Sequence, residues 1–244
     1  MPATSDTKPS AARFTGIDEA ALTFLRDLKQ NNDRDWFRER KPVYEEKLKR
    51  PVEALVTEAA EAARKRGFPL FPKAKNPLTR IYRDIRFSHD KTPFHTHVGA
   101  VLHGPPRMGG YGEVYIHIEP ANPFVAAGFW MPERDFLRMW RERMATKPAE
   151  FQKVVRSLAA KKVEWLDGYS LKRLPRGFER QADGNLESFF KRQVYIVRRK
   201  FTIRDIGSRS LVEKVAEFAV SARPLLEYGW SINYRPKRDI LDEE

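Results

Sequence analysis

The amino-acid sequence predicts an α+β fold, in which helices from both ends of the chain pack on one antiparallel β-sheet. Apolar residues recur at helical spacing near the N-terminus and again in the C-terminal half of the chain. Between Thr79 and Met131, β-branched and aromatic residues instead alternate with polar ones, and short turns separate these runs. Helix and strand patterns do not alternate as they would in a doubly wound parallel sheet. We therefore expect a single domain over residues 13–234, between a disordered tail at 1–12 and a polar tail at 235–244.

The first part of the chain predicts three helices. Asp18 is placed to cap the first, in which leucines recur at helical spacing, and Asp33 is placed to cap the second. Pro51 marks the start of a third, alanine-rich helix that runs to about Arg66.

An antiparallel meander is expected next, with four strands at residues 79–87, 94–103, 111–119 and 124–131. Pro132 then opens a helix, and the same kind of pattern predicts further helices over about 149–160, 185–191 and 208–222. One later strand is expected at residues 193–201. The sheet therefore consists of the meander and this later strand.

Composition excludes several classes of protein. The chain has 244 residues and no cysteine, which excludes disulfides, thiolate metal sites and cysteine nucleophiles. No run of residues approaches the ~20 apolar positions that a transmembrane helix needs. The first dozen residues lack the apolar centre of a secretory signal. We therefore expect a cytoplasmic protein with no membrane partner, while the oligomeric state stays open.

The positive charge of the chain is concentrated in one segment. The 46 Lys and Arg against 33 Asp and Glu give a formal net charge of +13, and residues 153–209 hold fifteen of these basic residues against six acidic ones. Basic groups and aromatic rings together can neutralise phosphates and stack on unpaired bases, so a nucleic-acid-binding surface is one hypothesis. The alternative is a solvated basic face whose aromatic residues point into the core. The aromatic residues in question are Phe178, Phe189, Phe190, Tyr195 and Phe201.

The most distinctive motif is the segment from Arg80 to Phe94, which is R-I-Y-R-D-I-R-F-S-H-D-K-T-P-F. It resembles the signature of domain of unknown function 2461, and the pair Asn31-Asn32 also fits that family. The resemblance covers about residues 14–234 and implies a stand-alone, mostly bacterial domain with no established activity. Family members usually carry Tyr where Phe94 stands and often Lys where His95 stands, so a hydroxyl at residue 94 is not essential here.

Two interpretations of this motif are open. If residues 79–87 form a strand, Arg83 falls on the apolar face, so that a bulge must re-aim it or a partner such as Asp90 must pair with it. In the first interpretation, the ion pairs of the motif only staple a hairpin. In the second, the motif binds a phosphate-bearing or other anionic ligand. The ligand-binding residues would be Arg80, Arg83, Arg86 and Lys91, with His95, Tyr115 and Glu119 beside them.

All five histidines fall inside the predicted meander, and in its third strand Glu113, Tyr115, His117 and Glu119 share one face. If the hairpins close symmetrically, His97 lies opposite His117 and next to Asp84 on one face, while His95 lies between Arg86 and Glu119. Two histidines and a carboxylate are the ligand set of many Zn²⁺ or Fe²⁺ sites, and the same groups can act as general acid and base. A metal-assisted enzyme with Asp84, His97 and His117 as catalytic or metal-binding residues is therefore the alternative to an anion-binding protein.

Overall fold

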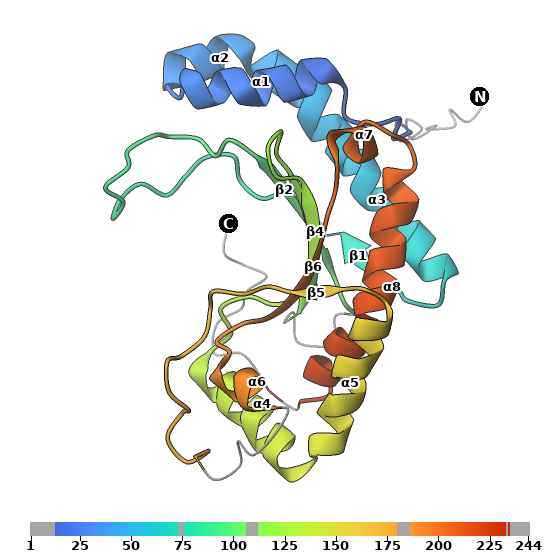
Figure 1. Ribbon diagram of the computed structural model, residues 1–244. Helices are drawn as coiled ribbons and strands as arrows, with labels where there is room; N and C mark the ends of the chain where they lie inside the picture. The colour runs from blue at the N-terminus through green and yellow to red at the C-terminus, as the bar shows by residue number, and fades with distance from the viewer. Residues whose placement is uncertain (1–12, 73–75, 106–111, 180–185, 233, 235–244) are drawn as a thin grey trace, which may run out of the picture.

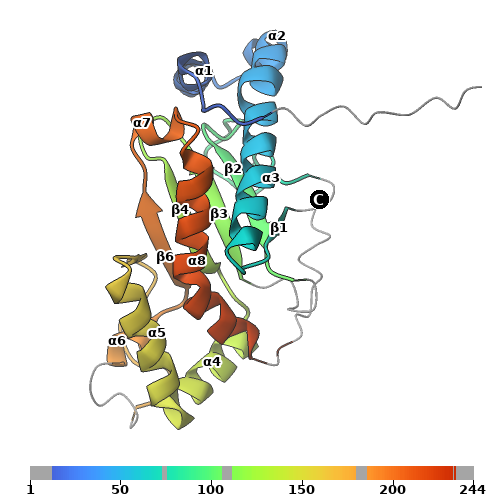
Figure 2. The ribbon, with the colours of Figure 1, turned by 90° about the vertical axis from the view of Figure 1, so that its right-hand side faces the viewer.

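The predicted fold class is confirmed by a computed structural model, which describes residues 13–72, 76–105, 112–179, 186–232 and 234. A six-stranded antiparallel sheet carries two long helices, α3 (Arg50–Lys65) and α8 (Leu211–Trp230), on one face (Figures 1 and 2). In the described parts of the chain no such pair of long helices covers the other face, which we call the open face (Figure 1). The two predicted tails lie outside the described residues.

The N-terminal helices begin where the sequence predicts. The carboxylate of Asp18 accepts a hydrogen bond from the backbone N–H of Ala21 at the start of α1 (Glu19–Gln30). Asp33 in the same way accepts hydrogen bonds from the N–H groups of Asp35 and Trp36 at the start of α2 (Arg34–Val43). Each side chain satisfies backbone donors that have no partner within the helix.

The predicted alanine-rich helix is confirmed as α3, with Pro51 in its first turn, but no break separates it from the helix before it. The chain runs without a break from α2 through a π-helical turn, η1 (Tyr44–Lys49), into α3. In that turn the N–H of Arg50 donates to the carbonyl of Glu45, five residues back. Pro42 and Pro51 flank the turn, and a proline ring inside a helix clashes with the carbonyl four residues before it. The wider π turn relieves this crowding without ending the helix.

The strands of the sheet lie in the order β1-β2-β3-β4-β6-β5, and each neighbouring pair is antiparallel. Their bounds are β1 (Phe71–Pro72), β2 (Val98–His103), β3 (Glu113–Ile118), β4 (Phe124–Phe129), β5 (Glu164–Trp165) and β6 (Tyr195–Lys200). The last three predicted strands of the meander and the later strand correspond to β2, β3, β4 and β6. The short strands β1 and β5 at the two edges have no counterpart in the sequence prediction.

The remaining helices follow the meander and flank the later strand. They are α4 (Arg134–Thr146), α5 (Pro148–Ala160), α6 (Glu187–Lys191) and α7 (Ile203–Ile206), followed by α8. The apolar face of the sheet, with Val114, Ile116 and Ile118 of β3, is buried against α3 and α8. None of the helices in the described parts of the chain is both long and apolar enough to cross a membrane.

The first predicted strand, at residues 79–87, is wrong. Leu78, just before this segment, forms an isolated bridge with Ala100, and within the segment Tyr82 forms one with Phe94. The chain then reaches away from the sheet as an irregular loop (Figure 1, teal). Thr79 still hydrogen-bonds to Gly99 of β2, but Arg83, Arg86 and Lys91 bind the loop's own side chains and backbone. We call residues 79–94 the arginine loop.

Asn32 fixes the end of the arginine loop to the helical layer. Its side-chain amide donates to the carbonyl of Phe94 at 2.9 Å and accepts from the N–H of Phe94 at 3.0 Å. This pair of bonds imitates one rung of a β-ladder between segments 62 residues apart. The ring of Phe94 then stacks on Phe37 of α2, with 4.2 Å between centroids.

Replacement of this amide is expected to destabilise the fold. Asn32→Ala removes both hydrogen bonds and leaves two backbone groups of Phe94 without a partner, which costs about 2 kcal/mol in the free energy of unfolding. Asn31→Ala is the matched control, because the exposed Asn31 amide only donates to Asp27 within α1. Urea unfolding of both variants measures the difference, and equal effects would contradict this role of Asn32.

Candidate functional site

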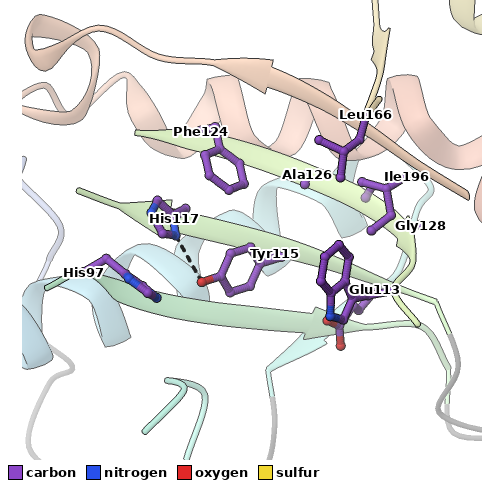
Figure 3. A pocket seen from close by; sticks show the side chains of 11 residues that line it. His97, Glu113, Tyr115, His117, Phe124, Ala126, Gly128, Leu166 and Ile196 are labelled. Carbon is purple, nitrogen blue, oxygen red and sulfur yellow. Dashed lines mark hydrogen bonds between the residues drawn. The ribbon is translucent and has the colours of Figure 1, made fainter. Parts of the chain in front are cut away.

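The open face of the sheet carries a pocket of about 440 Å³ (Figure 3). Strands β3 and β4 supply most of its wall, and β6 and the segment after β5 close one side. The lining residues are His97, Glu113, Tyr115, His117, Phe124, Ala126, Ala127, Gly128, Trp130, Leu166 and Ile196. Most of this wall is apolar, and the polar groups line the side formed by β2 and β3, with His97, Tyr115 and His117 toward one end and Glu113 toward the other (Figure 3).

Strand alternation explains why these side chains face the pocket. In β3 the residues Val114, Ile116 and Ile118 are buried on the helical face, so Tyr115 and His117 point to the opposite face. The sequence analysis predicts this division of β3 correctly. The polar residues of one short strand are thereby collected on the same wall of the pocket.

Three side chains of this strand form a hydrogen-bonded chain. The hydroxyl of Tyr115 lies 3.2 Å from Nδ1 of His117, and Nε2 of His117 lies 3.3 Å from Oε2 of Glu119. A carboxylate can only accept a hydrogen bond. Nε2 of His117 therefore carries the proton of the imidazole and donates a hydrogen bond to Glu119. Nδ1 of His117 then accepts from the Tyr115 hydroxyl. The phenol oxygen keeps its lone pairs for a group inside the pocket.

Burial keeps the two pocket histidines neutral. Desolvation lowers the pKa of His117 to about 4. Desolvation also lowers the pKa of His97 to about 4, with smaller contributions from the neighbouring His117 and His95. The rings of His97 and His117 lie 4.3 Å apart, and His117 stacks on Phe124 at 4.5 Å. At neutral pH the pocket therefore presents uncharged imidazoles.

The other ionisable groups of the wall are also shifted toward their neutral forms. Burial raises the pKa of Tyr115 to about 12, and the nearby Glu113 and Glu119 carboxylates add to this shift. Burial raises the pKa of the Glu113 carboxyl as well. These shifts follow from an apolar wall that solvates charge poorly. The arrangement suits hydrogen bonding to a neutral group of a ligand.

Gly99 makes room for the Tyr115 hydroxyl. It lies opposite His117 in the register of β2 and β3, and a Cβ at this residue would stand 2.5 Å from the Tyr115 oxygen. The same Cβ would stand 2.6 Å from the hydroxyl oxygen of Thr79. Only glycine allows the phenol ring to cross β2 at this point.

The predicted register between the second and third strands of the meander is wrong by two residues. Gly99, not His97, is the partner of His117 in the ladder. A shift of two residues leaves every side chain on its predicted face, so His97 and His117 still meet, as diagonal neighbours. His95 is the next ring in this row, 5.0 Å from His97.

The charged residues of the arginine loop bind one another and the loop's own backbone. Asp84 and Arg86 form an exposed ion pair with 2.7 Å between Oδ2 and Nη2. Arg83 donates to Asp90 at 2.6 Å, as the paired alternative predicts. Lys91 donates to the carbonyl of Ile85 at 2.9 Å. These contacts match the interpretation of the motif as a stapled loop.

The expected row of Asp84, His97 and His117 does not form. Asp84 belongs to the exposed loop and is paired with Arg86, whereas His97 and His117 line the pocket. In the parts of the chain that the structure describes, no group of three or more His, Asp or Glu side chains is arranged to hold a metal ion. The prediction of this row was wrong because it assumed a strand at residues 79–87, and that strand is absent.

The aromatic residues of the basic segment 153–209 are not available for stacking. Phe178, Phe189, Phe190, Tyr195 and Phe201 are all buried, with at most 9% of their surface exposed. The solvated-face alternative predicts this placement. Tyr195, for example, stacks on Trp140 in the core with 4.2 Å between centroids.

Sequence reasoning missed the apolar half of the pocket. Phe124, Ala126, Leu166 and Ile196 come from three separate segments, and none carries a chemical signal in the sequence. Gly128 is the one position with a signal, because a glycine inside a predicted strand indicates close approach of another backbone. Its φ of 137° and its contact with Tyr195 of β6 agree with that rule.

Comparison with protein families gives one match. The model described as "Conserved hypothetical protein (DUF2461)" matches residues 20–228, which include the arginine loop and every residue that lines the pocket. The chain belongs to the DUF2461 family. Comparison with curated proteins and with solved structures gives no match. For this DUF2461 protein, function therefore has to be argued from the site itself.

Proposed function

We propose that this DUF2461 protein binds a small organic molecule in the pocket on the open face of the sheet. The ligand has a largely apolar body and carries a neutral hydrogen-bonding group such as a hydroxyl. One observation carries the proposal: a cavity of about 440 Å³ with an apolar wall and one polar side is a typical ligand site.

The polar side of the pocket favours a hydroxyl-bearing ligand. Tyr115 donates to His117, so its oxygen accepts from an incoming hydroxyl. His97 also lines the pocket, and within the described residues its ring nitrogens have no hydrogen-bond partner. The low pKa values of His97 and His117 disfavour a fixed positive charge at this point, and with it an obligate anion.

The wall opposite this polar side favours an apolar body. Phe124 stacks on His117 and so continues the aromatic surface of the imidazole row. Trp130 is half exposed at the rim, with its indole 4.9 Å from the ring of Tyr169. An exposed indole at the mouth of a pocket loses water contacts when a ligand enters, which contributes to binding.

The tyrosine hydroxyl is expected to discriminate between two probes. Tyr115→Phe should weaken the binding of 2-naphthol about fivefold, because one neutral hydrogen bond contributes about 1 kcal/mol. Naphthalene lacks the hydroxyl, so its affinity should stay the same. Calorimetric titration measures both dissociation constants.

A second variant tests the pocket itself. Ala126 faces the cavity between Phe124 and Ile196, and Ala126→Leu fills part of the space. Both naphthalene and 2-naphthol should then bind at least fivefold more weakly, with the thermal midpoint unchanged. Failure of both probes to bind the wild type, or equal binding by Ala126→Leu, would overturn the proposal.

Two other hypotheses from the sequence stay predictions with tests of their own. Anion binding by Arg80, Arg83, Arg86 and Lys91 predicts that Arg86→Gln weakens phosphate binding without unfolding the loop. Nucleic-acid binding by residues 153–209 predicts an affinity that falls steeply with salt.

A further inference from the structure

A second cavity, of about 250 Å³, lies between the π-helical turn η1 and the start of the arginine loop. It is separate from the pocket on the open face and shares no lining residue with it. Its wall consists of Phe37, Lys41, Tyr44, Glu45, Lys49, Asn76, Leu78, Thr79, Arg80, Ile81 and Tyr82. Neither the family match nor the proposed function assigns a role to this cavity.

The cavity has an excess of positive charge. Lys41, Lys49 and Arg80 face a single carboxylate, Glu45, whose distance to Lys41 is 3.8 Å. Among the residues that the structure describes, Lys49 and Arg80 have neither an ion pair nor a side-chain hydrogen bond. This sets Arg80 apart from Arg83, Arg86 and Lys91, which are satisfied inside the arginine loop.

The π-helical turn brings one of these cations into the cavity. Residues five apart lie about 140° from each other around an α-helix, so Tyr44 and Lys49 would point in different directions there. A π turn closes its hydrogen bonds over five residues, which places Tyr44 and Lys49 on the same side. Both do line the cavity. Single π turns of this kind are frequent at functional sites.

Aromatic rings form the other wall of the cavity. Tyr82 packs edge-on against Phe37 with 6.0 Å between centroids and is also held by Phe94 at 5.1 Å. More than half of the Tyr82 surface nevertheless stays exposed. The cavity therefore offers an apolar surface next to two cations, Lys49 and Arg80, that no described side chain pairs with.

We propose that this cavity binds a small phosphate monoester with an aromatic or other apolar body. Lys49 and Arg80 bind the phosphate oxygens, and Lys41 adds to the positive potential. Phe37 and Tyr82 contact the body of the ligand. A phosphate dianion suits this site because several cations converge on it, and arginine and lysine are the usual phosphate-binding side chains.

Calorimetric titration of the full chain with phenyl phosphate at low ionic strength tests the proposal. Lys49→Gln and Arg80→Gln should each weaken binding about tenfold, while Lys49→Arg should retain most of it. Lys47→Gln is the matched control, because Lys47 lies on the same π turn but pairs with Asp18 and Glu46 outside the cavity. It removes the same charge and should leave the dissociation constant within twofold of the wild type.

Inorganic phosphate should bind more weakly than phenyl phosphate, and phenol should not compete for the site.

Three results would overturn the proposal. The first is the absence of phenyl phosphate binding to the wild type. The second is an equal loss in Lys47→Gln and Lys49→Gln, which would indicate diffuse attraction to a basic protein. The third is a loss in Arg86→Gln with full binding by Lys49→Gln, which would place the anion on the arginine loop instead. The naphthol experiments report on the other pocket, so the two proposals succeed or fail separately.

Discussion

Lowering the pH from 7.5 to 5 is expected to reduce the free energy of unfolding by about 2 kcal/mol through His117 alone. Burial lowers the pKa of this histidine from its ordinary 6.5 to about 4 in the folded protein. As the pH falls below 6.5, the unfolded chain therefore binds a proton that the folded protein refuses. The stabilisation is fully present above pH 6.5 and is lost as the pH falls toward 4.

Other ionisable groups near His117 also contribute to the pH dependence of stability, so the wild type has to be compared with a variant that lacks this histidine. His97 titrates over the same range, and Tyr115, Glu113 and Glu119 lie on the same strand face as His117. In His117→Gln the side chain stays neutral at every pH. The difference in unfolding free energy between this variant and the wild type should therefore narrow by about 2 kcal/mol from pH 7.5 to 5.

Urea unfolding at pH 7.5, 6.0 and 5.0 measures this difference. His89→Gln is the control, because His89 is exposed in the arginine loop. Its difference from the wild type should stay constant over the range. A constant difference for His117→Gln would show that the buried imidazole is not held neutral.

Gly128→Ala is expected to destabilise the protein by about 3 kcal/mol or more. Gly128 lies in β4 with a φ of 137°, a region that side chains rarely adopt. A Cβ at this position would also collide with the backbone carbonyl of Tyr195 in β6. Relief of this collision requires β4 and β6 to separate, which breaks their ladder and opens the pocket wall.

The variant Gly168→Ala separates the cost of the backbone conformation from the cost of the steric collision. Gly168 also has a positive φ, of 96°, but a Cβ there would have no atom within 4 Å. This variant should lose only the conformational contribution, about 1–2 kcal/mol. Urea unfolding gives both values, with soluble yield as the readout if Gly128→Ala does not fold. A loss in Gly128→Ala no larger than in Gly168→Ala would contradict the steric argument.

Much of the fold is predictable from local patterns. Asp18 and Asp33 cap their helices as expected, and alternation in β3 assigns Tyr115 and His117 to the correct face. The prediction of a strand at residues 79–87 was wrong because charged and apolar residues can alternate in the same way in a strand and in a loop held by ion pairs. Arg83 already violates the strand pattern, and its bond to Asp90 is the reason.

The candidate site was only partly predictable. The histidine cluster follows from composition and alternation, but its exact pairing depends on the connection between β2 and β3, whose length the sequence does not define. The apolar wall at Leu166 and Ile196 depends on where β5 and β6 join the sheet. The π turn depends on how two prolines are accommodated within one long helix, which local propensity does not specify.

The positions of α3 and α8 affect how the chain folds during synthesis. The two helices pack against each other and on the same face of the sheet (Figure 2), although α3 ends at Lys65 and α8 begins at Leu211. At ordinary rates of translation, about 10–30 s pass between the emergence of these two residues from the ribosome. The strands of the sheet are made during that interval, and their apolar face is then covered by α3 but not yet by α8. Molecular chaperones that shield such surfaces are therefore expected to engage this chain before its last helix is made.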